Sequence, residues 1–101
     1  MNANTQANIN PGSITIIGRR WRDSYNNTYH VSEIYVCGKH IHTTERDYGY
    51  GEQYLYTAMD WLVHNGIINW DRQSTPWRWA RNWDVELSFS VSDVKRKKDL
   101  I

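Results

Sequence analysis

The sequence predicts an α+β fold: an antiparallel sheet of about four strands with one main helix packed on one face, in the order β-β-β-α-loop-β. Three observations predict it. Residues 13–45 hold β-type segments between turn residues, residues 52–64 have helical periodicity, and residues 84–91 alternate strictly between apolar and polar. A single helix with one apolar stripe must bury that stripe against the sheet. The 101 residues fit one domain, which we place at residues 13–91.

The first three strands are predicted from turn signals and side-chain type. Residues 13–21, SITIIGRRW, are rich in β-branched side chains and end before the turn residues at 23–28. Residues 29–37, YHVSEIYVC, carry apolar side chains on both faces, which is typical of a central strand. Cys37-Gly38-Lys39 predicts a tight turn, and residues 40–45 would return as the third strand of a hairpin.

The helix is predicted over residues 52–64. From Tyr54 onward, apolar side chains recur at i, i+1, i+4, i+5, i+8 and i+9, and these positions form one continuous stripe. Asn65-Gly66 predicts the end of the helix, with Gly66 in the left-handed conformation.

The helix is preceded by Tyr48-Gly49-Tyr50-Gly51. Backbone amides at a helix N-terminus can hold an anion, but this stretch lacks the lysine and the glycine spacing of phosphate-binding loops. We therefore interpret the glycines as backbone freedom for a sharp turn, with Tyr48 and Tyr50 packed on either side.

The remaining segments complete the fold. Residues 1–12 are rich in Asn and predict a flexible leader. Residues 69–83 have no clean period, and Pro76 argues against a continuous helix, so we expect a long aromatic loop. Residues 84–91 predict a half-buried antiparallel strand, and residues 92–101 a basic tail or a short helix.

The composition argues against several classes of function. A net charge of +1 is low for a general polyanion binder. The single cysteine, Cys37, allows neither an intrachain disulfide nor a thiol-rich zinc site, and we expect no cofactor and no metal. His40 and His42 are two residues apart and would share one face of a strand. No signal peptide or membrane span is predicted, nor is any local catalytic motif present, so we expect a non-enzymatic protein of the cytoplasm.

The main candidate site is an aromatic and basic segment at residues 70–83. Tryptophan and arginine are the residue types most enriched at binding hot spots, and both also stack on nucleobases. An alternative is that the tryptophans seal an open face of the sheet, with arginines stacked over them. The predicted partner-binding residues are Trp70, Arg72, Trp77, Arg78, Trp79, Arg81 and Trp83.

A second set of basic residues lies outside that segment. Three arginines flank Trp21 at the end of the first strand, and a run of four cations lies in the tail. A basic tail is often only solvated, but it can also contact phosphates or dock on an acidic partner. The candidate nucleic-acid contacts are Arg19, Arg20, Arg22, Lys95, Arg96, Lys97 and Lys98.

Two stretches resemble a family of small, mostly uncharacterised proteins of tailed bacteriophages. The resemblance rests on the Gly18–Trp21 strand end, Asn27–His30, the Tyr35–Gly38 hairpin, Tyr48–Gly51 and Gln53–Ala58, which together cover about half of the chain. The family pattern usually has Asn-Gly at the hairpin, where this chain has Cys37-Gly38, and it does not include the tryptophan-rich segment. The resemblance implies a phage accessory protein acting in the host-cell cytoplasm.

Three functions follow as hypotheses. The first is a phage protein that binds and inhibits a host protein, such as an anti-CRISPR or other anti-defence factor acting on a nucleic-acid-targeting effector. The second is a small nucleic-acid-binding module that uses the aromatic and basic residues. The third is a structural role, with self-association into a homodimer through exposed aromatic side chains.

Overall fold

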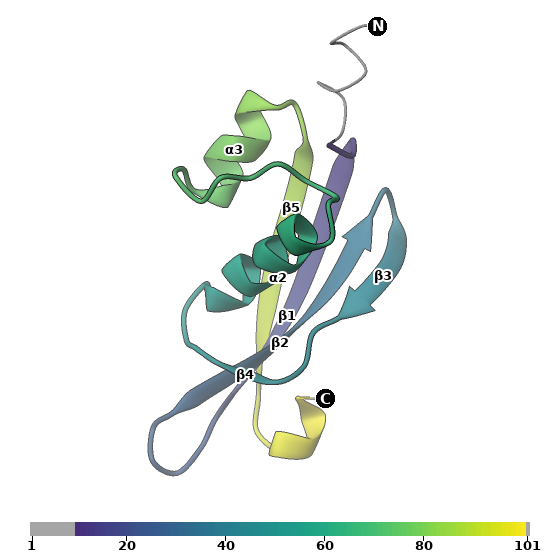
Figure 1. Ribbon diagram of the computed structural model, residues 1–101. Coiled ribbons are helices and arrows are strands. Elements are labelled where there is room, and N and C mark those ends of the chain that lie inside the picture. Colours follow the sequence, from purple (N-terminus) through teal and green to yellow (C-terminus); the bar gives the residue numbers. More distant parts are fainter. Residues whose placement is uncertain (1–9, 101) are drawn as a thin grey trace, which may run out of the picture.

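The computed structural model describes residues 10–100 and has the predicted α+β architecture (Figure 1). A mixed sheet carries helix α2 across one face, with a second, shorter helix, α3, beside it. The residues predicted as a flexible leader lie largely outside the described part of the chain. The elements are β1 (Ser13–Arg22), β2 (Thr28–Val36), β3 (Lys39–Thr43), β4 (Asp47–Tyr48), α2 (Gln53–His64), α3 (Pro76–Asn82), β5 (Glu86–Val94) and the 3₁₀ helix η1 (Lys97–Asp99).

The sheet has the order β3-β2-β1-β5, and the two-residue strand β4 also pairs with β2. Strand β2 is central, as predicted, and it is antiparallel to β1, β3 and β4. The prediction of an antiparallel last strand is wrong, because β5 runs parallel to β1, with Ile16 beside Phe89. Alternation of apolar and polar residues is the same in both directions, so the pattern at 84–91 held no information on direction.

Helix α2 supplies the inner layer of the core, and its predicted position is confirmed. Its buried side chains are Tyr54, Leu55, Ala58, Met59 and Leu62. They pack on the fully buried Ile14, Ile16 and Ile34 of β1 and β2. Residues at even positions of these two strands therefore face α2, and residues at odd positions face away from it.

The end of α2 also agrees with the prediction. Gly66 has a φ of +72°, which side chains other than glycine adopt at a cost. Its N–H donates to the carbonyl of Val63, and the N–H of Ile67 donates to Leu62. These two bonds satisfy carbonyls that the helix leaves free, and Ile67 folds back onto the core.

The stretch before α2 agrees only in part. Gly49 and Gly51 both have positive φ, and a Cβ on Gly49 would lie 2.4 Å from Cγ of Gln53. The glycines are therefore needed for the turn. Tyr50, however, is 76% exposed rather than packed, and Tyr48 is 59% exposed with one ring edge against Tyr29.

Residues 69–83 contain a helix that the sequence analysis did not predict. Pro76 is the first residue of α3, where its missing N–H costs nothing because that N–H would have no partner inside the helix. The hydroxyl of Thr75 accepts a hydrogen bond from the N–H of Arg78 and caps the helix. Pro76 therefore starts a helix, and the prediction of a long loop over residues 69–83 is wrong.

Strand β5 begins at Glu86 rather than at residue 84, ends at Val94 rather than at residue 91, and leads into a short helical turn. Leu87, Phe89 and Val91 face the core as expected, and the strand continues to Val94. Helix η1 follows, and Leu100 after it is fully buried.

Candidate functional site

The predicted partner-binding segment divides into a buried half and an exposed half. Trp70 and Trp79 are only 4% and 3% exposed, and both belong to the core. Each indole N–H has a partner: Trp70 donates to the carbonyl of Ser74, and Trp79 donates to the side chain of Asn69. Because these rings are packed and their polar atoms are satisfied, the structure removes both from the predicted binding surface.

Arg72 also has a structural position. Its Nε donates to a carboxylate oxygen of Asp60 on α2 at 2.7 Å. Its guanidinium carbon lies 5.9 Å from the centroid of Trp70. Arg72 therefore covers a buried ring, as predicted by the alternative in which arginines stack over tryptophans that seal the sheet. It also joins the loop to α2.

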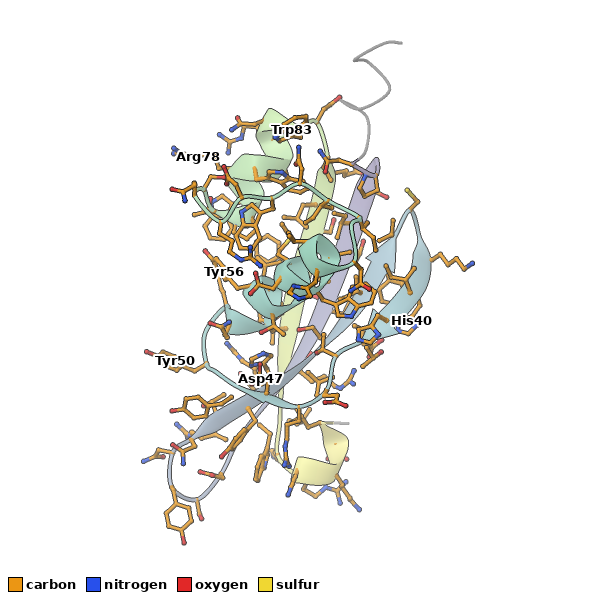
Figure 2. All side chains as sticks on the ribbon, in the orientation of Figure 1. His40, Asp47, Tyr50, Tyr56, Arg78 and Trp83 are labelled. Carbon is orange, nitrogen blue, oxygen red and sulfur yellow. The ribbon has the colours of Figure 1, made fainter. Side chains whose placement is uncertain are left out.

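Four of the predicted partner-binding residues remain exposed around α3, and we call them the α3 surface: Trp77, Arg78, Arg81 and Trp83. Trp77 is 38% exposed and stacks on Phe89 of β5 with centroids 6.0 Å apart. Trp83 ends the helix and is 43% exposed. Figure 2 shows Arg78 and Trp83 at the same end of the molecule, far from the β1–β2 hairpin.

The three arginines at the end of β1 do not form one surface. Side chains alternate along a strand, so Arg19 points away from α2 whereas Arg20 and Arg22 lie on its side. Arg19 forms an ion pair with Glu33 and also donates to the carbonyl of Leu100. Arg20 is held by both carboxylate oxygens of Asp93 and by the carbonyl of Gly51.

The hydrogen bonds of the Glu33 carboxylate shift two pKa values. The hydrogen bond from Arg19 lowers the pKa of Glu33 below its ordinary value of 4.5, and burial opposes this shift. The hydroxyl of Tyr35 donates to the same carboxylate, and that bond raises the pKa of Tyr35. Arg19 is therefore part of a satisfied polar network, which leaves it few donors for a nucleic acid.

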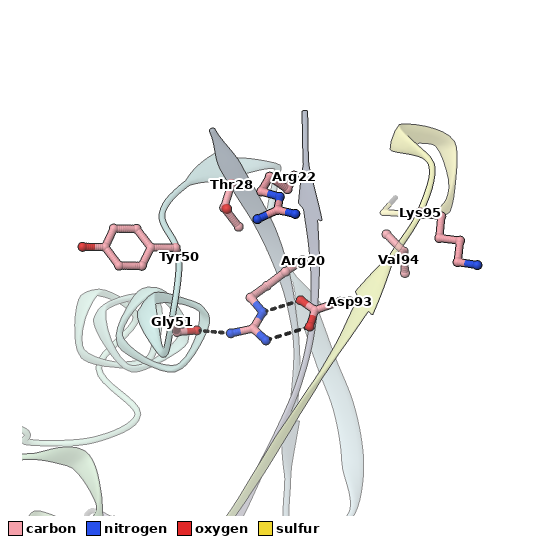
Figure 3. Close-up of a pocket in the computed structure, with 8 residues that line it drawn as sticks. All are labelled: Arg20, Arg22, Thr28, Tyr50, Gly51, Asp93, Val94 and Lys95. Atoms are coloured by element: carbon pink, nitrogen blue, oxygen red, sulfur yellow. Dashed lines mark hydrogen bonds and ion pairs between the residues drawn. The ribbon is translucent and has the colours of Figure 1, made fainter. Parts of the chain in front are cut away.

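A cleft of about 530 Å³ opens beside Arg20, between the start of α2 and the ends of β1 and β5 (Figure 3). Its lining includes Arg22, Tyr50 and Lys95. Asp93 neutralises Arg20 there, so Arg22 and Lys95 provide the excess positive charge. The cleft therefore has a small excess of positive charge, which could attract an anion only weakly. The sequence had predicted a larger patch, in which all three arginines of β1 would contact a nucleic acid.

The tail cations follow β5 directly. Arg96 forms an ion pair with Asp99, and the side chains of Lys95, Lys97 and Lys98 are exposed. The chain then returns to the face of the sheet that α2 does not cover, where the carbonyl of Leu100 meets Arg19. The basic run is therefore held next to the sheet.

An aromatic cluster that was not predicted from the sequence lies on that same face. Trp21, Tyr29 and Tyr48 are neighbours on β1, β2 and β4, and we call them the outer aromatic strip. The rings of Trp21 and Tyr29 stack with centroids 5.9 Å apart, and Tyr48 meets Tyr29 edge-on at 5.7 Å. The turn at 23–28 could have indicated the first pair, because a hairpin places residues 21 and 29 opposite each other.

The histidines do not form a metal site. A bulge in β3 pairs His40 with Tyr35 and His42 with Ile34, so the two histidines lie on opposite faces and the prediction of one shared face is wrong. His42 stacks on Trp61 with centroids 4.2 Å apart, beside a second cleft of about 500 Å³. Among residues 10–100, no group of three or more His, Cys, Asp or Glu side chains is close enough to hold a metal ion.

Comparison of the chain with protein-family models, with curated proteins and with solved structures finds no match. In the described part of the chain, no helix combines the length and the apolar character that crossing a membrane requires.

Proposed function

We propose that this protein is a non-enzymatic phage accessory protein that binds a host protein through the α3 surface and inhibits it. The observation that carries the proposal is the exposure of Trp77 and Trp83. Two other tryptophans of the same segment, Trp70 and Trp79, already fill the core beneath α3. The fold therefore does not need the outer faces of Trp77 and Trp83 for its own packing.

The size of the exposed rings supports a binding role. A tryptophan can bury up to about 250 Å², so 38% and 43% exposure leave roughly 100 Å² of each ring in water. Covering that area is worth up to about 2.5 kcal/mol per ring. The flanking Arg78 and Arg81 add charged donors, and tryptophan with arginine is the composition of interface hot spots.

The resemblance to small proteins of tailed bacteriophages supports a host protein as the partner. Within that class, an anti-defence role such as an anti-CRISPR factor agrees with a compact chain that carries a binding surface and no catalytic group in an identifiable motif. Inhibition would follow from occupying a functional surface of the host protein. This assignment rests on the resemblance and not on the geometry of α3.

The experiment is affinity capture from lysate of the bacterial host, followed by binding measurements with the purified captured protein. Trp83→Ala should weaken binding about tenfold, and Arg78→Glu with Arg81→Glu should weaken it further. Tyr25→Ala is the matched control, because Tyr25 is 82% exposed at the tip of the β1–β2 hairpin.

The proposal fails if Trp83→Ala and the double arginine variant bind the captured protein as tightly as the wild type does. Loss of binding in Tyr25→Ala alone would place the contact on another surface. Sedimentation at two protein concentrations checks the homodimer hypothesis, and self-association abolished by the arginine variants would assign the α3 surface to a second copy of the chain. Assay of the captured protein's own activity, with and without this protein, tests inhibition.

A further inference from the structure

We propose that the outer aromatic strip is a binding site for the bases of single-stranded nucleic acid. The strip residues alternate along their strands with the core residues that face α2, so they lie on the opposite face of the sheet. The strand register places the three side chains on one face of the sheet. Trp21 pairs with Tyr29 and Tyr29 pairs with Tyr48, at positions that alternate with the core residues. Three neighbouring strands thus present three aromatic rings on the face that α2 and α3 leave uncovered.

The rings are accessible to different degrees. Tyr48 is 59% exposed, and Trp21 and Tyr29 are half-buried. Stacking between Trp21 and Tyr29 holds both rings in place, so a ligand would meet a fixed surface rather than mobile side chains. Base-binding sheets stack unpaired bases on aromatic rings of adjacent strands, and Tyr48 is the most exposed ring of the strip for such a contact.

Positive charge is placed beside the rings. The guanidinium carbon of Arg46 lies 5.6 Å from the centroid of Tyr29. On the other side, Val94 pairs with Trp21, whereas the next residue, Lys95, lines the cleft on the α2 side. The exposed Lys97 and Lys98 come just before Leu100, whose carbonyl bonds to Arg19 on the same face as the strip.

This combination favours nucleic acid over a protein partner. Aromatic rings with flanking cations match bases joined by phosphates, and stacking on each ring contributes about 1–3 kcal/mol without regard to base identity. The neighbouring part of this face carries the Arg19–Glu33 ion pair beside Ile17 and Val31, so charged groups continue next to the strip. Bases of a duplex hide their faces in the stack, so a single strand is the form that fits.

The test is fluorescence anisotropy of a labelled short oligothymidylate, with a duplex of equal length as the comparison. Tyr48→Ala should weaken binding of the single strand about 5- to 100-fold, the loss of one stacked base, and Tyr48→Phe should retain binding. Tyr50→Ala is the matched control, because this tyrosine is even more exposed and lies two residues away at the cleft on the α2 side. Arg46→Ala should reduce affinity and also reduce its dependence on salt between about 50 and about 200 mM.

Three results would overturn the proposal: no binding of the oligonucleotide by the wild type in low salt, equal binding by Tyr48→Ala and wild type, or equal affinity for the duplex. Tyr48 is on a two-residue strand and largely exposed, so its replacement should leave the fold intact, which circular dichroism of each variant verifies. The double arginine variant of the α3 surface should bind the oligonucleotide as tightly as the wild type does. The nucleic-acid site is therefore tested independently of the proposed host-protein contact.

Discussion

Replacement of Gly18 by alanine tests how closely α2 lies on the sheet. A Cβ at position 18 would be 2.5 Å from Cδ2 and 2.7 Å from Cγ of Tyr54. Ordinary carbon contacts are about 3.5–4.0 Å, so the ring or the helix must move by about 1 Å. Tyr54 is 3% exposed at the first turn of α2 and has little room to move.

The expected cost of Gly18→Ala is about 1–3 kcal/mol, which is the range for an added carbon in a packed core. For a domain of this size, each kcal/mol lowers the melting temperature by about 4–8 °C. We therefore expect a fall of about 5–20 °C, measured by thermal and urea unfolding followed by circular dichroism. Gly12→Ala is the matched control, because a Cβ at Gly12 has no atom within 4 Å.

A double-mutant cycle with Tyr54→Ala separates the clash from other effects. If the ring is the obstacle, Gly18→Ala should cost much less in the Tyr54→Ala background than in the wild type. A Gly18→Ala protein that melts at the same temperature as Gly12→Ala would refute the reasoning. A cost that is unchanged when the ring is absent would do the same.

Two further predictions concern stability. Glu33 has a lower pKa in the folded than in the unfolded chain, so its ion pair with Arg19 stabilises the fold above the unfolded pKa near 4.5, and this contribution is lost as the pH falls through the lower folded value. Urea midpoints measured across acidic pH should therefore fall more steeply for the wild type than for Glu33→Gln, and equal slopes would contradict the assignment. Gly66→Ala should lower the free energy of unfolding by about 1 kcal/mol, because alanine is strained at φ +72°. A melting temperature equal to or above that of the wild type would show that the left-handed residue does not limit the helix end.

The parts of the fold that could be predicted from the sequence depend on local periodicity. The stripe of α2 and the end of the helix at Gly66 involve residues within one or two turns of each other, so their pattern is visible in a short window. Helix α3 was missed because proline was interpreted only as a helix breaker, although Thr75-Pro76 is also a helix start.

The direction of β5 and the faces of the histidines depend on tertiary structure. A parallel and an antiparallel strand share the same alternation, and the bulge that separates His40 from His42 leaves no clear mark in five residues. For the candidate site, composition located the aromatic segment but could not show which of its side chains are buried and which are exposed. Burial of Trp70 and Trp79 depends on how α3 packs on α2 and β5, which residue type alone does not determine.

The parallel pairing of β1 with β5 has a consequence for biosynthesis. Strand β1 is made first, and its hairpin partner β2 leaves the ribosome soon afterwards, but its other neighbour is among the last residues to be translated. Until then, the backbone N–H and C=O groups along one side of β1 have no strand to bond to. A chain that stops before residue 86 would expose that bare edge to other nascent chains, and we expect it to aggregate rather than to persist as a shorter folded protein.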